Sequence, residues 1–429
     1  MRIVACLFIA FVWALTFIGC GSPGNQAGPE TKTRESLKPL IGDELRYLAF
    51  QVFEGGLDPA IPFDVALVYT PKEKVAGLVH DIVTAIGATG GQKTRLAFIL
   101  GPIAFDHTDA EARQIIDDGF ELALRENIAV GFHIDDSMFW RKRSDLINDP
   151  ANIEWTDFDG SSATGLLLDW ARPPARMVFN SPTIRGEVTR RARDVIGAHV
   201  ASHLAVLRSQ GKEDLFAGII AGWESHMGQD VRTKDRVGFH ALANAGFGPK
   251  MPPSNLGAEV AAIVAAYINL WADGLAQGGI DSNRIYTHVA FLPRARFQEL
   301  SAPVGMTYED VLNAAPSSQR PSVAFAASAR PGFSTYPVIG VFDQIYEELS
   351  KHGNPWWASA EGTNTIPGGP PGNSGKDMET YLARSFNHGA ALVTIFGWGI
   401  GGQSMPNNPY RTVTEGAEAL AAYRKFLAQ

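Results

Sequence analysis

The sequence predicts an α/β fold made of eight repeats of a strand followed by a helix. Short apolar runs alternate along the chain with stretches whose apolar residues recur at helical spacing. The runs are apolar throughout, which is typical of parallel strands buried on both faces. No two runs are joined by a two-residue hairpin turn, so helical crossovers are expected between them. Eight such units indicate a single (β/α)8 barrel, whose chemistry lies in the loops that follow the strands.

Each apolar run is expected to form one strand of the barrel. Two long connections, 135–180 and 225–255, follow the third and fourth strands and are expected to wall the mouth of the barrel. The eight expected strands are Leu45–Phe53, Thr94–Leu100, Ile128–Ile134, Leu215–Trp223, Arg284–Phe291, Pro321–Ser328, Asn354–Ala360 and Ala391–Trp398.

The expected helices begin at recognisable signals. Thr70 is a cap residue before Pro71 at the first helical position. Thr108 and Glu111 have the spacing of a capping box. The expected helices are Pro71–Ile86, Thr108–Asn127, Ser181–Arg208, Leu256–Ala276, Tyr308–Ala314, Val338–Lys351, Asp377–Asn387 and Thr414–Ala428.

The composition excludes several classes of function. Of the 429 residues, 45% are hydrophobic and 19% charged, as in ordinary globular proteins. A formal charge of −8 and scattered Lys and Arg residues exclude the basic face that a nucleic-acid partner requires. No GxGxxG follows a strand with a helix behind it, and the sequence holds neither a Walker-type phosphate loop nor a GxSxG elbow. We therefore expect no cofactor and no serine nucleophile.

The N-terminal segment predicts export from the cytoplasm. Arg2 precedes the apolar segment Ile3–Ile18, which is shorter than the roughly 20 residues that span a bilayer. Such a segment is typical of a secretory signal. Cys6 lies inside it, and the only other cysteine is Cys20, so the chain has no disulfide framework.

The end of that segment resembles the lipobox of bacterial lipoproteins, because small Gly19 directly precedes Cys20. The resemblance implies a signal peptide at 1–19 and a lipid on Cys20 that anchors the protein in the bacterial cell envelope. Residues 20–44 are polar and form a flexible tether, followed by the barrel at 45–429. A plain cleaved signal or an uncleaved anchor is the alternative.

Two glutamates follow the ends of widely separated strands. Glu224 comes after the fourth run and Glu361 after the seventh, and each stands in an apolar frame. Cleavage of a glycosidic bond requires two carboxyls that flank that bond. Burial disfavours the charged form of a carboxylate, so an unpaired one in such a frame is expected to serve chemistry. The alternative is that one or both glutamates bind an arginine for structural reasons.

These two positions resemble the large clan of retaining glycoside hydrolases that use a (β/α)8 barrel. The resemblance implies that Glu224 is the acid/base and Glu361 the nucleophile, and that the substrate is an oligosaccharide or polysaccharide. Trp398, at the end of the eighth run, matches the aromatic platform often found beneath the bound sugar. Many members have asparagine immediately before the acid/base, whereas this chain has Trp223.

Further polar residues lie near expected strand ends. His133, Asp135 and Asp136 close the third run and are expected to bind sugar hydroxyls or to orient a catalytic carboxyl. Together with His226 or His288 they could instead bind a divalent metal, and a structural Asp–His pair is a third possibility.

Several aromatic residues and one arginine complete the candidate binding site. Tyr286 and His288 share one face of the fifth strand, so they either point into the site or fill a layer of the barrel. Arg330 and Tyr336 follow the sixth run and could orient the nucleophile or stabilise a loop. Trp140, in the long loop after the third run, and Trp223, at the end of the fourth run, are expected to contact sugar, although core packing explains such aromatics equally well.

Two rival functions remain open from the sequence. One is a glycan-binding lipoprotein without catalysis, and the other is a metal-dependent hydrolase built on His133 and Asp135. The sequence does not determine the sugar, the linkage or the oligomeric state.

Overall fold

A computed structural model describes residues 44–52, 72–165, 173–228, 236–301, 307–308, 320–364, 378–398 and 416–429. The predicted signal peptide and Cys20 lie outside these residues. The described strands are β1 (Arg46–Val52), β2 (Thr94–Ile103), β3 (Ala129–Ile134), β4 (Phe216–Ala221), β5 (Ile285–Thr287), β6 (Gly332–Ser334), β7 (Trp357–Gly362) and β8 (Ala390–Trp398).

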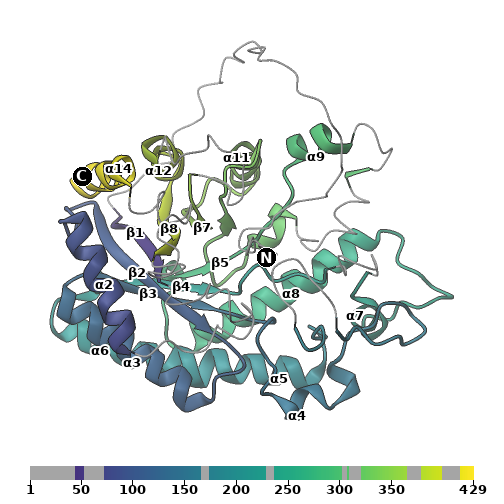
Figure 1. Cartoon of the computed structure of the whole chain (residues 1–429). Helices are drawn as coiled ribbons and strands as arrows, with labels where there is room; N and C mark the ends of the chain where they lie inside the picture. The colour runs from purple at the N-terminus through teal and green to yellow at the C-terminus, as the bar shows by residue number, and fades with distance from the viewer. Residues whose placement is uncertain are drawn as a thin grey trace, which may run out of the picture.

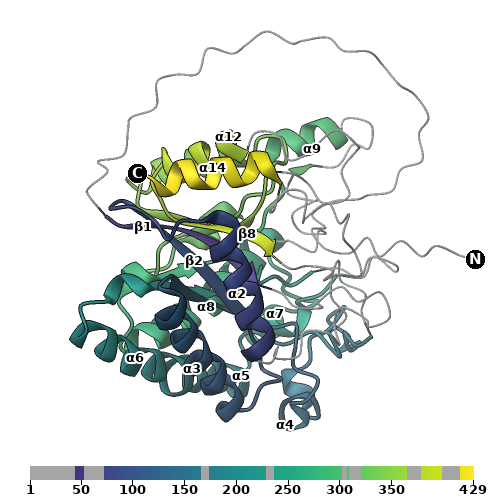
Figure 2. The same cartoon turned by 60° about the vertical axis from the view of Figure 1, so that its left-hand side comes forward.

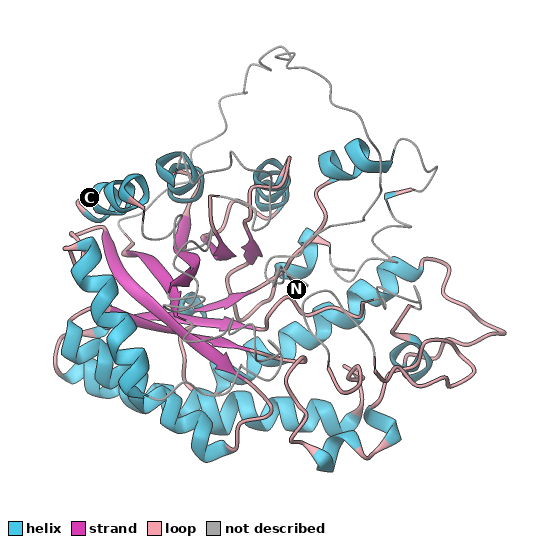
Figure 3. Cartoon of the chain, viewed as in Figure 1, coloured by secondary structure: helices cyan, strands magenta, loops and turns pink. Residues whose placement is uncertain are grey.

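The eight strands form a barrel, as predicted. They are all parallel and follow the order β5-β4-β3-β2-β1-β8-β7-β6. Backbone hydrogen bonds close the remaining edge, since Thr287 N donates to Arg330 O and Ser334 N donates to Val289 O, each at 3.0 Å. Figures 1 and 3 show the strands at the centre with helices around them. The fold is therefore a (β/α)8 barrel.

The helices surround the strands. Thr108 caps α3 with the predicted capping box, and α5 and α6 are joined through one turn of π-helix at Arg191–Gly197. The described α-helices are α2 (Lys72–Ile86), α3 (Asp109–Glu126), α4 (Ser144–Ile147), α5 (Pro182–Arg190), α6 (Ala198–Ser209), α7 (Phe239–Asn244), α8 (Leu256–Gln277), α9 (Arg294–Ser301), α11 (Val341–Lys351), α12 (Met378–Phe386) and α14 (Ala417–Leu427).

One helix within the described residues, α8, is long and apolar enough to cross a membrane by length and composition. It packs against β4, β5 and α5, and Val264, Ile268 and Trp271 are buried in that packing. Helix α8 therefore has the character of a core helix of the barrel.

The predicted position of the sixth strand is wrong. Residues Pro321–Ala324 form a 3-10 helix, and β6 is the three-residue segment Gly332–Ser334. Proline fixes φ and lacks an amide proton, so Pro321 starts a helical turn more readily than a central strand. At Gly332 a Cβ atom would lie 2.0 Å from the carbonyl oxygen of Thr287, so only glycine permits this strand contact. Arg330 therefore precedes β6 rather than following it.

The core has two layers on either side of the strands. Along β1, Leu48 and Phe50 point outward into the cluster beneath the helices. Tyr47 and Ala49 point into the barrel, where small alanines of neighbouring strands surround them. Gln51 has the same parity as these two and is fully buried. The inner layer is thus apolar at the bottom and turns polar towards the mouth.

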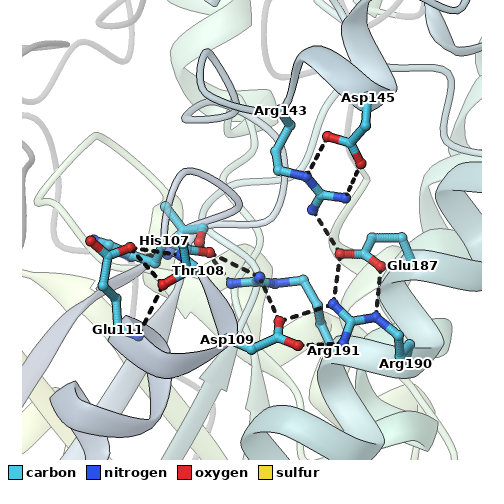
Figure 4. Close-up of polar contacts among 10 residues, drawn as sticks. His107, Thr108, Asp109, Glu111, Arg143, Asp145, Glu187, Arg190 and Arg191 are labelled. Carbon is cyan, nitrogen blue, oxygen red and sulfur yellow. Dashed lines mark hydrogen bonds and ion pairs between the residues drawn. The ribbon is translucent and has the colours of Figure 1, made fainter.

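An ion-pair network attaches the loops after β2 and β3 to helix α5 (Figure 4). Buried Arg191 donates to the carbonyl oxygens of Ala104 and His107, at 2.9 and 3.0 Å. Glu187 accepts from Arg143 of the β3 loop at 2.7 Å and from Arg190 at 2.8 Å. Charge-assisted bonds of this kind restrain geometry. The network therefore fixes the rim of the barrel beside the end of β3.

Candidate active site

Glu224 stands on a sharp turn directly after β4. Its φ is 54°, in the left-handed region that non-glycine residues rarely adopt. Gly222, two residues earlier, has a φ of 87°, and a Cβ there would lie 2.7 Å from Ser225 Oγ. Strained backbone of this kind persists where surrounding contacts over-determine it. The turn lifts the Glu224 side chain, which is 12% exposed, into the mouth.

Two residues from the end of β3 hold this turn. Asp136 accepts hydrogen bonds from the Trp223 amide at 3.2 Å and from the Ser225 hydroxyl. His133 Nε2 lies 3.2 Å from the Gly222 carbonyl oxygen. Both side chains are fully buried. They were expected to bind sugar hydroxyls or to orient a catalytic carboxyl, and their place under the turn fits the second of these roles.

Glu361 lies at the end of β7 beside the Glu224 carboxyl. Ser334 of β6 is in register with Glu361 of β7, and neighbouring strands lie about 4.8 Å apart. The Ser334 hydroxyl donates to Glu224 Oε1 at 2.5 Å. The two carboxyls, 137 positions apart in the sequence, therefore meet at one side of the mouth.

The environment of Glu361 opposes its ionisation. Burial raises its pKa well above the ordinary value, and the negative charge of Glu224 raises it further. The Tyr336 hydroxyl donates to Glu361 Oε1 at 2.9 Å and lowers the pKa in part, as do the side chains of Gln51 and Trp223. Oε2 is buried and makes no hydrogen bond of good geometry with the described residues. The pair of glutamates therefore favours carrying a single shared proton.

A chain of hydrogen bonds crosses the top layer of the barrel and ends on Glu224. Gln51 Nε2 lies 3.0 Å from His133 Nδ1, and His133 Nε2 lies 3.2 Å from His288 Nδ1. His288 Nε2 then lies 2.8 Å from Ser334 Oγ. We call the five residues Gln51, His133, His288, Ser334 and Glu224 the relay. It connects strands β1, β3, β5, β6 and β4 through their interior side chains.

Hydrogen-bond chemistry gives the relay one direction. Burial lowers the pKa of His133 to about 3 and that of His288 well below its ordinary value, so both rings are neutral. The Gly222 carbonyl can only accept, so His133 carries its proton on Nε2. Nδ1 must then accept from Gln51, and the Gly222 carbonyl oxygen and His288 Nδ1 share the single Nε2 proton of His133 as acceptors. Every donor in the relay consequently points towards the Glu224 carboxylate.

The structure moves two further predicted ligands away from the substrate. Asp135 is fully buried and accepts from the backbone amides of Met138 and Phe139, at 3.2 and 2.9 Å. Burial raises its pKa to about 8, with the charge of Asp136 as the next cause. Trp140 is fully buried and donates to the Ala175 carbonyl oxygen at 3.1 Å. Both residues shape the loop after β3.

Three more predictions of binding residues are corrected. Arg330 pairs at 2.6 Å with Glu44, two residues before the start of β1, and therefore lies at the opposite end of the barrel. Tyr286 fills the apolar lower layer of the interior. Trp398 packs edge-on against outward-facing Phe50, with ring centroids 5.2 Å apart. Strand parity and the misplaced sixth strand explain these differences.

Trp223, His288 and Tyr336 do lie beside the glutamates. The Trp223 ring is 4.9 Å from that of His133, and its side chain faces Glu361. His288 Nε2 lies 3.9 Å from Glu224 Oε1. Two members of the site, Gln51 and Ser334, are absent from the predicted set. Gln51 could have been identified from the sequence, because it is a lone polar amide within an apolar strand. Ser334 could not, because the sixth strand was predicted at the wrong position.

A metal centre on His133 and Asp135 does not fit this geometry. Both ring nitrogens of His133 are engaged in hydrogen bonds, and the Asp135 carboxylate caps backbone amides. His226 Nδ1 lies 2.5 Å from the Glu224 carbonyl oxygen, and burial lowers its pKa to about 3. His133, Asp135 and His226 therefore stabilise the backbone of the loops after β3 and β4.

Comparison with known proteins supports the fold. No protein-family model matches the sequence, and no curated protein sequence matches it either. The catalytic domain of β-amylase from Paenibacillus polymyxa is similar in structure, with a TM-score of 0.55 and 8% identity over 90% of this chain and 99% of that one. A β-galactosidase from the psychrophilic Marinomonas ef1 has a TM-score of 0.48 and 13% identity over 89% of this chain and 58% of that one.

The glycoside hydrolase domain of PgaB from Bordetella bronchiseptica has a TM-score of 0.47 and 11% identity over 89% of this chain and 99% of that one. At these identities the likeness concerns the fold. The class that fold and site define is a (β/α)8-barrel protein with two adjacent carboxyls at its mouth.

The raised pKa of Glu361 predicts a stabilising substitution. Its folded pKa lies above the ordinary 4.5, so ionisation costs the folded state stability as pH rises from about 4.5 through the folded pKa. We expect Glu361→Gln to raise the free energy of unfolding at pH 8, because the neutral amide removes the cost of ionising a buried carboxyl. At pH 4 the gain should vanish, as measured by thermal unfolding.

The exposed glutamate Glu379 provides the control for this measurement. Glu379→Gln should change stability little at either pH, because its partner Lys425 is also exposed. An equal gain for Glu361→Gln at pH 4 and pH 8 would contradict the assigned burial effect.

Proposed function

We propose that the protein is a glycoside hydrolase that cleaves a bond in an oligosaccharide or polysaccharide by a retaining mechanism. The observation that carries the proposal is the proximity of the Glu224 and Glu361 carboxyls at the strand ends: Ser334 donates to Glu224 and is paired in register with Glu361. Two carboxyls that face one bond can protonate the leaving oxygen and attack the sugar carbon. The barrel that it shares with a β-amylase domain is a scaffold compatible with this chemistry.

Glu224 is assigned as the acid/base. The Ser334 hydroxyl occupies Oε1, so a proton on this carboxyl resides on Oε2. Oε1 accepts the same hydrogen bond whether Glu224 is neutral or ionised. The side chain can therefore give its proton to the leaving oxygen and later take one from water without losing its position.

Glu361 is assigned as the nucleophile. Side chains of Tyr336, Gln51 and Trp223 favour its ionised form. When the shared proton lies on Glu224, the neighbouring charge that raises the pKa of Glu361 is removed. The proton position that Glu224 needs as an acid thus also prepares Glu361 for attack on the anomeric carbon.

Substitution of each glutamate tests the proposal. Wild-type protein should hydrolyse one member of a polysaccharide panel, and the first product seen by proton NMR should keep the anomeric configuration of the substrate. Glu361→Gln and Glu224→Gln should each lower turnover about 10³-fold or more, because covalent and acid/base steps are both lost. Unchanged melting curves or a gain in stability would show that the variants fold.

Two outcomes would overturn this assignment. A wild type that binds a glycan without releasing product would support a glycan-binding protein instead. A Glu361→Gln variant with undiminished turnover would remove this carboxyl from the chemistry.

The relay predicts a positioning role for Ser334. Ser334→Ala deletes the donor to Glu224 and leaves His288 Nε2 without its acceptor at 2.8 Å. A lost hydrogen bond to a charged group is worth about 1.5–3 kcal/mol, so kcat should fall about 10- to 100-fold with little change in KM. The pH profile of kcat should also shift.

Ser359→Ala is the matched control for this variant. Ser359 lies on the neighbouring strand β7 and bonds to Thr335 and Tyr381 without contacting the relay. A loss of activity equal to that of Ser334→Ala would show a general effect of the buried hydroxyls.

We further propose that Cys20 carries a lipid that anchors the protein in a bacterial cell envelope. Support comes from the apolar segment, Gly19 and the polar tether that follows. Expressed in a bacterium with labelled fatty acid, wild type should carry label and sediment with membranes, whereas Cys20→Ala should not carry label. Cys6→Ala, the control at the other cysteine, should remain labelled, and equal labelling of both variants would refute the assignment.

A further inference from the structure

Three metal-binding side chains converge on the helical shell, away from the carboxyl pair. His199 and His203 lie one turn apart on α6, so they project from the same face of that helix. Asp117 reaches them from α3, and its Oδ1 lies 2.7 Å from the Nε2 atom of each histidine. Figures 1 and 2 show α3 and α6 side by side. All three ligand atoms lie within 4.8 Å of one another.

We propose that Asp117, His199 and His203 form a zinc site that joins helices α3 and α6. Two imidazole nitrogens and one carboxylate oxygen are a ligand set that zinc accepts, with water in the fourth position. The three side chains are 43%, 25% and 27% exposed, so both the ion and that water can enter from solvent. Among the described residues this is the one group of three such ligands with converging atoms.

The spacing between Asp117 and each histidine needs only a small adjustment. Zinc–ligand bonds of about 2.0–2.1 Å in a tetrahedron separate ligand atoms by about 3.3 Å. Each histidine nitrogen therefore has to move about 0.6 Å away from the Asp117 oxygen, which side-chain rotation supplies. Without the ion, Nε2 of each ring donates its proton to Asp117 Oδ1. On binding, each ring gives up that proton or moves it to Nδ1, so that the Nε2 lone pair can bind the ion.

Packing already orients the histidines. The Phe120 ring stacks on His203, with centroids 4.6 Å apart and planes 7° from parallel. The His199 ring meets that of His203 edge-on, with centroids 5.2 Å apart. Preset rings lower the cost of assembling a metal site.

The consequence is a link between two barrel units. Helix α3 follows β2, and α6 leads into β4, which carries the Glu224 turn. An ion that binds the folded protein but not the unfolded chain raises the free energy of unfolding. At concentrations well above Kd, the increase is proportional to the logarithm of the ion concentration divided by Kd. We infer a structural role, because the site lies on the helices and not at the strand ends.

Zinc titration of the full-length, chelator-treated protein tests the proposal. Wild type should bind one Zn²⁺ per chain at this site by calorimetry, and its Tm should rise by roughly 3 °C or more at about 100-fold excess over Kd. Co²⁺ in place of zinc should give the visible absorption bands of a four-coordinate ion.

Matched variants decide where the ion binds. Asp117→Asn and His199→Ala alter partly exposed side chains, and each should remove that equivalent of zinc and the rise in Tm. His80→Ala should bind like wild type, because His80 lies on α2 and pairs with Glu126 alone, at 3.3 Å. Zinc binding that is absent in wild type, or equal in wild type and Asp117→Asn, would overturn the proposal.

Discussion

Repulsion between two adjacent carboxyls at the mouth is the constraint on which the upper layer of this barrel depends. Like charges within a few ångströms in a low-dielectric site cannot both ionise freely. Burial of Glu361 and the nearby charge of Glu224 both act in this direction. Hydrogen-bond donors offset this repulsion, since the Tyr336 hydroxyl donates to Glu361 and the Ser334 hydroxyl donates to Glu224. Such a pair holds one mobile proton, which is what acid/base chemistry requires.

The buried polar residues around Glu224 and Glu361 hydrogen-bond to neighbouring protein groups and fix their positions. A buried donor or acceptor without a partner is costly, so a polar layer inside a barrel must be connected throughout. His133 donates to the Gly222 carbonyl oxygen of the turn after β4 and also contacts His288, the next residue of the relay. Asp136 holds two groups of the same turn. His133 and Asp136, which look like binding residues in the sequence, therefore stabilise the left-handed backbone conformation of Glu224.

Long-range contacts in the outer shell extend this support. Arg191 and Arg143 attach the loops after β2 and β3 to α5 (Figure 4). The group on α3 and α6 lies farther along the same helical region, between the units that contain β2 and β4. The contacts of Arg191 with His107 and of Asp117 with His199 each join residues about 80 positions apart in the sequence. The helical shell thus restrains the loops that surround the mouth of the barrel.

The sequence alone determined the repeating architecture. Continuous apolar runs and capping signals predicted the barrel, seven strands and the two glutamates that end β4 and β7, because these features follow from local periodicity. The position of the sixth strand was set by the tertiary structure. Three residues are too few to show an apolar pattern, and β6 forms because it pairs with β7 and with the segment at β5. The tertiary structure also decided which polar residues serve the site. Gln51 and Ser334 belong to it, and Arg330 does not, because strand parity and barrel closure set the direction of a side chain.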